Sequence, residues 1–511
     1  MKTLRITIPL LAAAATALQA ISIQSSQAGS APLAIEPGVQ SWHPGVPIVL
    51  ADGLLTIDAQ ERFRVEVREN TFDFNDAANP VGRLTDDAIF LNRFRLGMLL
   101  RPSRMFGFYV QGQDSREWSD RGGVPFLLGS EGDNAFDVRQ AYFDIGEAEK
   151  SPVELRFGRQ VLSYGDERIV GDFDWNNFGR VFDAARLRVN GLPAASAIDI
   201  FGGSVVNIQP DNAADSGDFV FDQAEWDDLF FGIHASLGVF PFQKTEVYAF
   251  YRDKADNGNL YADPSFPLPA SQLAAYDVGQ EVFTLGTRHA SFPGKLNGWD
   301  YEVEAAVQFG SVDRQTVGGV TAPGVPKGLY AGDDAELNHF AWAAHLQGGY
   351  TFDSVVAKPR LGVFYDFATG DDNLGDGENN TFLNLFPTNH KFYGYMDAFS
   401  WKNLHDAGLS LTAKPNDKLT LRCDQHFFWL ATTSDAWYRA NGVSTVRPLD
   451  GKAHAASNYA GAETDVTLTY APVKWANILL GYSHFFAGSY LDDTGVSDDA
   501  DFGYLQVAIT F

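Results

Sequence analysis

Residues 151–189 read SPVELRFGRQVLSYGDERIVGDFDWNNFGRVFDAARLRV. Val153, Leu155 and Phe157 alternate with charged residues, and the same alternation returns near the end of the stretch. Successive side chains of a strand point to opposite faces, so this pattern predicts two strands, each with an apolar face and an arginine-bearing face. Between them lies a segment dense in glycine, aspartate, arginine and aromatic residues, residues 164–182, which we name the insert.

The same alternation continues through most of the chain. It is clearest in residues 56–68, where Phe63, Val65 and Val67 share one face and Arg62 and Arg64 share the other. Beyond the N-terminus no long segment has the three-to-four-residue spacing of a helix, and no run of about 18 apolar residues predicts a membrane-spanning helix. About eighteen strands are predicted, in residues 56–68, 88–100, 104–113, 137–145, 153–159, 183–189, 197–205, 230–239, 246–252, 282–289, 300–309, 340–352, 360–367, 404–413, 418–428, 463–470, 475–485 and 502–511.

The connections between these strands alternate between short and long. Proline, which cannot donate a hydrogen bond to a sheet, marks each short connection, at Pro102, Pro152, Pro193, Pro241, Pro293, Pro359, Pro415 and Pro472. Compact soluble domains rarely carry so many long loops. The pattern instead predicts an all-β fold, a transmembrane outer-membrane β-barrel of about 18 antiparallel strands with short periplasmic turns and long extracellular loops.

The two ends of the chain agree with export to an outer membrane. Lys2 and Arg5 precede an apolar stretch that ends in a small-residue cleavage site at Ala28, so residues 1–28 are predicted to be a signal peptide. Residues 29–52 are predicted to be an irregular lead, and residues 53–511 the barrel. The last strand alternates up to a terminal aromatic, Phe511, which is typical of substrates of the barrel-assembly machinery. We therefore expect contact with outer-membrane lipid.

Charge separates by position. The formal net charge is −27, which argues against binding to nucleic acid. Aspartate lies largely in the connections, whereas arginine lies largely on strand faces, and a charge on the lipid side of a barrel is costly. The arginines predicted to face the pore are Arg62, Arg64, Arg93, Arg95, Arg139, Arg156, Arg186, Arg188, Arg360 and Arg422. They either form ion pairs that only rigidify the wall or attract an anionic solute, because a guanidinium stays charged and binds carboxylates through two hydrogen bonds.

The insert adds a family resemblance. RFGRQVLSYGDERIVGDFDWNNFGRVFDAARL (156–187) and LFPTNHKFYGYMD (385–397) resemble signatures of the alginate export family of outer-membrane barrels. The resemblance implies an eighteen-stranded monomer whose charged pore is narrowed by loops and passes an anionic polysaccharide. Carried over onto this chain, it also implies a set of charged constriction residues: Arg159, Asp166, Arg168, Asp174, Arg180, Asp183 and Arg186. The alternative is that the insert's glycines and aspartates simply fold a tight loop.

Three other features contain groups that could bind a metal or react. A carboxylate-rich loop offers oxygen ligands that suit calcium, but without EF-hand spacing it is predicted to be a solvated loop rather than a metal site. Its residues are Asp371, Asp372, Asn373, Asp376 and Glu378. Ser483 and His484 partly resemble a nucleophile elbow, yet adjacent strand residues point to opposite faces, so no catalysis is predicted. Cys423 has no internal disulfide partner, and no cofactor is expected.

These observations favour a diffusion channel for an alginate-like polyuronate or for small anionic solutes. A general or nutrient-specific porin, or a surface barrel occluded by its loops, remains an alternative.

Overall fold

The computed structural model describes residues 46–75, 87–119, 134–147, 150–208, 221–255, 279–313, 316–317, 320–321, 336–374, 376–442, 445–447, 449 and 451–510. The predicted signal peptide, most of the predicted lead and Phe511 lie outside these residues. Among the described residues, no helix is long and apolar enough to cross a membrane.

Eighteen antiparallel strands close into a barrel. They are β2 (Leu55–Glu69), β3 (Asp87–Ser103), β4 (Phe106–Ser119), β5 (Asn134–Ile145), β6 (Val153–Gln160), β7 (Phe182–Leu192), β8 (Ser196–Asn207), β9 (Gln223–Leu237), β10 (Gln243–Lys254), β11 (Gln280–Ser291), β12 (Trp299–Asp313), β15 (Glu336–Thr351), β16 (Arg360–Ala368), β18 (Leu404–Asn416), β19 (Leu419–Leu430), β20 (Tyr459–Val473), β21 (Ala476–Ala487) and β22 (Ala500–Thr510). Each strand pairs with its neighbour in the chain, and β2 pairs with β22 to close the cylinder, with Arg64 opposite Gln506. The predicted fold is confirmed, and every predicted segment overlaps one of these strands.

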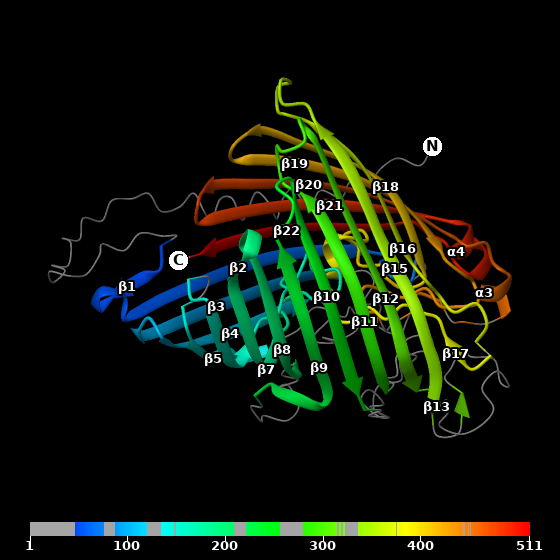
Figure 1. Ribbon diagram of the computed structural model, residues 1–511. Coiled ribbons are helices and arrows are strands. Elements are labelled where there is room, and N and C mark those ends of the chain that lie inside the picture. The colour runs from blue at the N-terminus through cyan, green and yellow to red at the C-terminus, as the bar shows by residue number, and fades with distance from the viewer. Residues whose placement is uncertain are drawn as a thin grey trace.

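Smaller elements are not part of the cylinder wall. They are β1 (Ile48–Leu50), η1 (Ala51–Gly53), η2 (Pro193–Ala195), β13 (Thr316–Val317), β14 (Val320–Thr321), β17 (Glu378–Asn379), η3 (Asn389–Lys391), α3 (Gly451–Ala455) and α4 (Ser489–Thr494). The end of the predicted irregular lead is thus ordered, because β1 pairs with the start of β2. In Figure 1 the blue β2 lies beside the red β22, and α3, α4 and β17 gather at one end of the barrel.

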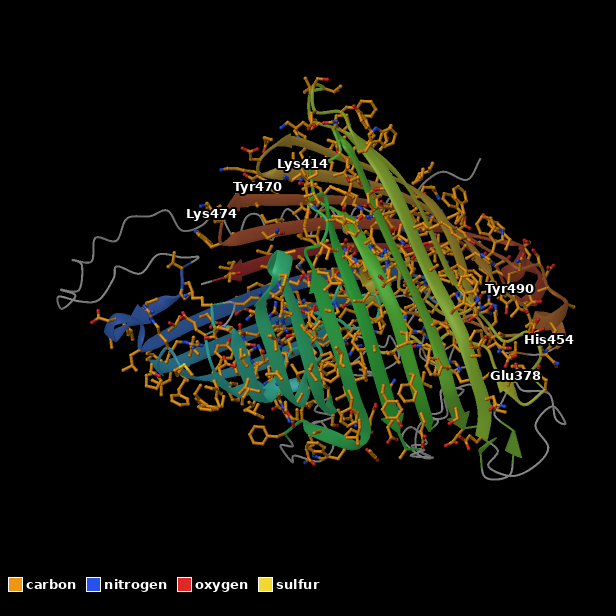
Figure 2. The ribbon with its side chains drawn as sticks, viewed as in Figure 1. Glu378, Lys414, His454, Tyr470, Lys474 and Tyr490 are labelled. Atoms are coloured by element: carbon orange, nitrogen blue, oxygen red, sulfur yellow. The ribbon has the colours of Figure 1, made fainter. Side chains whose placement is uncertain are left out.

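The two ends of the barrel differ. Figure 2 labels Lys414, Tyr470 and Lys474 at the end with short turns, and Glu378 and Tyr490 at the end with long loops. This separation matches the alternating short and long connections.

The barrel wall has its apolar face outside. On β3, Met98 is 42% exposed and Leu96 is 40% exposed, whereas Arg93 is 1% exposed and Arg95 is 6% exposed. Acyl chains can cover the outward apolar side chains, so the guanidinium groups take the inward positions, where polar partners are available. The inward parity predicted for these arginines is therefore the one observed.

Loops fill part of the interior with aromatic side chains. Phe386, which follows β17, packs on Phe182 and Phe230 of the wall with ring centroids 5.2 and 4.8 Å away. Phe399 stacks on Phe428 at 4.0 Å. The loop segments inside the barrel therefore have a packed core of their own, which positions them for the site described next.

Candidate pore constriction

The insert is fixed to the wall through its backbone. Side chains of β2 and β4 donate to backbone carbonyls of the insert: Arg62 Nη1 to Asp174 O at 2.6 Å, Arg64 Nη1 to Trp175 O at 2.6 Å and Ser115 Oγ to Asn177 O at 2.8 Å. A loop without regular structure has unsatisfied carbonyls, so lumen side chains that donate to them hold it in one conformation. Several predicted pore arginines thus position the loop.

Asp174 lies at the centre of an arginine cluster. Its carboxylate accepts from Arg93 Nη2 at 3.0 Å and from Arg95 Nη1 at 2.7 Å, and Arg139 lies 3.9 Å away. Arg93 and Arg62 also share the Asp174 carbonyl. Four guanidinium groups therefore surround one carboxylate. We name these four residues, Arg62, Arg93, Arg95 and Arg139, the arginine cluster.

The charge of the cluster controls the protonation of Asp174. Burial alone would raise the pKa of its carboxyl, but the positive charges of Arg93, Arg95 and Arg62 outweigh burial and hold that pKa well below its usual range. The side chain of Asp174 is nevertheless 40% exposed. It is thus an ionised group that a passing solute can approach, backed by a surplus of positive charge.

The other end of the insert reaches the opposite wall. Buried Arg168 lies 2.9 Å from Nε2 of His345, 3.7 Å from Asp366 and 3.9 Å from Glu304, on β15, β16 and β12. Between this wall and β2 to β4 lie β5 to β11 in one direction and β18 to β22 in the other. The insert therefore crosses the lumen.

The second family motif, residues 385–397, packs directly against the insert. Val170 and Phe386 form a parallel bridge, in which Gly171 N donates to Phe386 O at 2.7 Å and Phe386 N donates to Ile169 O at 2.9 Å. Two motifs far apart in sequence thus build one constriction.

An aromatic sandwich ties this pair of loops to the wall. The Trp175 ring has the guanidinium of Arg64 3.9 Å from its centroid, and His390 of the second motif stacks on it at 3.7 Å. His390 Nδ1 lies 3.0 Å from a carboxylate oxygen of Asp397. Stacking of this kind adds stability beyond burial.

The remaining predicted residues of the insert, Arg180 and Asp166, also bind the second motif. Arg180 donates to the carbonyls of Gly171 and Pro387 at 3.1 and 3.0 Å, and burial together with nearby Arg252 lowers its pKa to about 10. Asp166 lies 3.2 Å from Lys391 of the second motif.

Other predicted pore arginines lie toward the short-turn end and pair with carboxylates of the wall. The pairs are Arg156 with Asp144, Arg188 with Asp199, Arg360 with Asp300 and Arg422 with Asp424. Arg186 differs from them, since within the described part of the chain it makes no hydrogen bond or ion pair. It is half-buried and lies directly across the β6–β7 ladder from Arg156.

Two residues carried over from the family do not line the pore. Asp183 shares the outward face of β7 with Ala185 and Leu187, whereas its neighbours Phe182 and Ala184 are buried inside. Arg159 pairs with Asp183 at 2.9 Å. The strict alternation along β7 thus puts this ion pair on the outer surface rather than at the constriction.

The acidic loop caps its own turns. Asp371 accepts from Asn373 N at 3.1 Å, and Asp376 accepts from Glu378 N at 3.0 Å. Asp372 has no such bond within the described chain. Among the described residues, no group of three or more His, Cys, Asp or Glu side chains is arranged to hold a metal ion. Ser483 donates to Asp465 inside the wall, whereas His484 contacts Asp501.

Sequence reasoning missed several residues that build the constriction. Trp175, Asn177 and His390 act through stacking and backbone contacts, and Ser115 and Gln113 act as wall donors to the insert. These contacts join distant segments, so strand alternation gives no sign of them. Only the dense polar and aromatic composition of the two motifs marked the region.

The chain matches a known family over most of its length. The profile of the family described as "Alginate export" matches residues 59–504, most of the chain. The chain belongs to the alginate export family. The chain has no match among curated proteins.

Solved structures with the same fold support a channel. OccAB1 of Acinetobacter baumannii matches with a TM-score of 0.56 and 12% identity, covering 89% of this chain and 96% of that chain. OccK1 (OpdK) of Pseudomonas aeruginosa matches with a TM-score of 0.53 and 11% identity, covering 89% of this chain and 98% of that chain. At 11–12% identity, these structural similarities show the fold alone. Together with the family, they make this member of the alginate export family an outer-membrane channel.

Proposed function

We propose that this channel passes anionic solutes, small carboxylates and short uronate oligomers, by diffusion past the arginine cluster. The observation that carries the proposal is the charge surplus there, where Arg93, Arg95 and Arg139 face the carboxylate of Asp174 and Arg62 binds the backbone carbonyl of the same residue. In a water-filled bore such a surplus raises the local concentration of anions and lowers that of cations.

Arg186 supports the same conclusion from the short-turn side. It faces the lumen next to Arg156, and no carboxylate of the described chain neutralises it. A guanidinium without a partner can exchange water for a solute carboxylate and release it again, as conduction requires.

The two loops favour small solutes over a long polymer. The insert crosses the lumen and is joined to the second motif by the Val170–Phe386 bridge. Buried Arg168 and the aromatic sandwich hold these loops at both walls, so widening the bore would break several contacts at once. The family description keeps export of a polyuronate as the second candidate.

Reversal potentials in planar bilayers under a salt gradient test the proposal. The expected result is anion preference in the wild type that falls in Arg186→Gln, a change that removes charge without removing a hydrogen bond. Arg104→Gln, at an exposed short turn, is the matched control. Cation preference in the wild type would contradict the proposal. Block of the current by oligouronates of increasing length then separates small-solute passage from polymer export.

A further inference from the structure

The short-turn end of the barrel carries exposed lysines on four turns that follow one another around the rim. These turns join β11 to β12, β15 to β16, β18 to β19 and β20 to β21. The lysines are Lys295, Lys358, Lys414, Lys418 and Lys474, which we name the lysine arc. None of them makes an ion pair within the described chain, and the exposed carboxylates of the same turns are only Asp353 and Asp417. This part of the rim therefore has a surplus of positive charge.

The long-loop end carries the opposite charge. Its exposed carboxylates include Asp227, Glu281, Glu336, Asp372, Asp376, Glu378, Asp492 and Asp493, which we name the acidic rim. Within the described chain none of these eight forms an ion pair. The exposed basic side chains described at this end are Lys452 and, deeper at the constriction, Lys391. Figure 2 shows the separation, with Lys414 and Lys474 at one end of the barrel and Glu378 at the other.

Fixed charges of opposite sign at the two ends of a bore enrich different mobile ions. Anions gather at the lysine arc and the arginine cluster, and cations gather at the acidic rim. A voltage that draws anions from the short-turn end also draws cations inward from the long-loop end, so both kinds of ion fill the bore. The reverse voltage draws both kinds out and depletes it. Because conductance follows the number of mobile ions, the two polarities should differ.

We infer that the channel rectifies: under a voltage it passes anions more readily from the short-turn end to the long-loop end than in the reverse direction. This inference rests on the proposed function, since it takes anions as the solutes that cross the arginine cluster. The asymmetry changes the rate of passage and leaves the equilibrium across the membrane unchanged. In the orientation usual for outer-membrane barrels, with long loops outside, the favoured direction leads out of the cell.

Single-channel current–voltage curves in symmetric potassium chloride test the inference on the wild-type barrel. Orientation is assigned with Ser354→Cys on the exposed β15–β16 turn, in a Cys423→Ser background, by adding an impermeant thiol reagent to one side. At about 100 mV and about 0.01 M salt, the current should be at least about twofold larger when the long-loop side is positive. At about 1 M salt, where screening is nearly complete, the ratio should be about one.

Variants at the two ends test the cause of the asymmetry. Changing Lys358, Lys414, Lys418 and Lys474 together to Glu makes both ends acidic and should bring the low-salt ratio to about one. Asp492→Asn with Asp493→Asn should lower the ratio from the other end. The matched control is Arg159→Gln with Asp183→Asn, which removes one charge of each sign from the outer surface and should leave the ratio unchanged.

The outcomes separate this inference from the proposed function. A linear curve in a wild type whose reversal potential still shows anion preference would overturn the inference alone. So would a larger current of the opposite polarity, or a ratio that the four Lys→Glu changes leave as it was. Cation preference in the reversal potential would contradict the proposed function, and the inference with it.

Discussion

Replacing Asp174 by Asn should make the channel more selective for anions. The change removes the one carboxylate of the arginine cluster and leaves four guanidinium groups in place. At about 6 Å in water, a unit charge repels a passing anion by about 0.7 kcal/mol. The same charge attracts a passing cation equally, so removing it should raise anion permeability and lower cation permeability about threefold each, and should raise the anion-to-cation ratio about tenfold at low salt, where screening is weak.

The variant should keep its fold. The asparagine oxygen can still accept from Arg93 or Arg95, and the backbone bonds from Arg62, Arg64 and Ser115 are unaffected. Because the Asp174 side chain is 40% exposed, water can replace the lost acceptor. We expect the insert to lose about 1–2 kcal/mol of local stability, which is far too little to open a barrel of eighteen strands.

The measurement is the reversal potential of single channels in a planar bilayer under a tenfold gradient of potassium chloride. Asp183→Asn is the matched control, since it makes the same chemical change on the outer surface. An unchanged ratio, or a shift toward cations, would show that ions do not pass Asp174 and would refute the reasoning. Wild-type selectivity should also hold at mildly acidic pH, because the lowered pKa of Asp174 keeps it ionised there.

Three further changes probe the loops. Arg168→Gln leaves two buried carboxylates without their cation and should destabilise the folded loops by about 3–5 kcal/mol, visible as noisier channel currents. Gly394→Ala places a Cβ 2.4 Å from Oε2 of Glu463 at a φ of +81°, so a lower thermal midpoint is expected, with unchanged stability arguing against this contact. Burial and nearby Asp435 raise the pKa of Asp371 to about 6. The folded state therefore binds the Asp371 proton more tightly than the unfolded state does. The protein then loses stability as the pH rises from about 4 to about 6. Asp371→Asn should then increase the free energy of unfolding at pH 7.5 by at most about 3 kcal/mol, which is seen as a higher thermal midpoint. Near pH 4 the variant and the wild type should have the same thermal midpoint.

The barrel could be predicted because its signal is local. Alternation with a period of two is a property of each strand alone, and it assigned Arg93 and Arg95 to the lumen correctly. The same alternation sends Arg186 inward and Asp183 outward. It was therefore a better guide to Asp183 than the motif resemblance, which carries no information about faces.

The partners of the inward arginines could not be predicted. Arg62 and Arg64 bind backbone carbonyls of the insert, which every residue possesses and no sequence pattern marks. Likewise, the bridge between Val170 and Phe386 joins segments that only the closed barrel brings together. The composition of the two motifs located the constriction, but the contacts that build it depend on tertiary structure.

The path of the insert also constrains the order of biogenesis. Its anchors are β2 to β4, made early in translation, and β12, β15 and β16, made much later, and it also needs the second motif. A partly assembled barrel cannot offer all of these anchors together. The narrow part of this channel therefore matures last, after the cylinder around it, and an arrested intermediate should leak more than the finished protein.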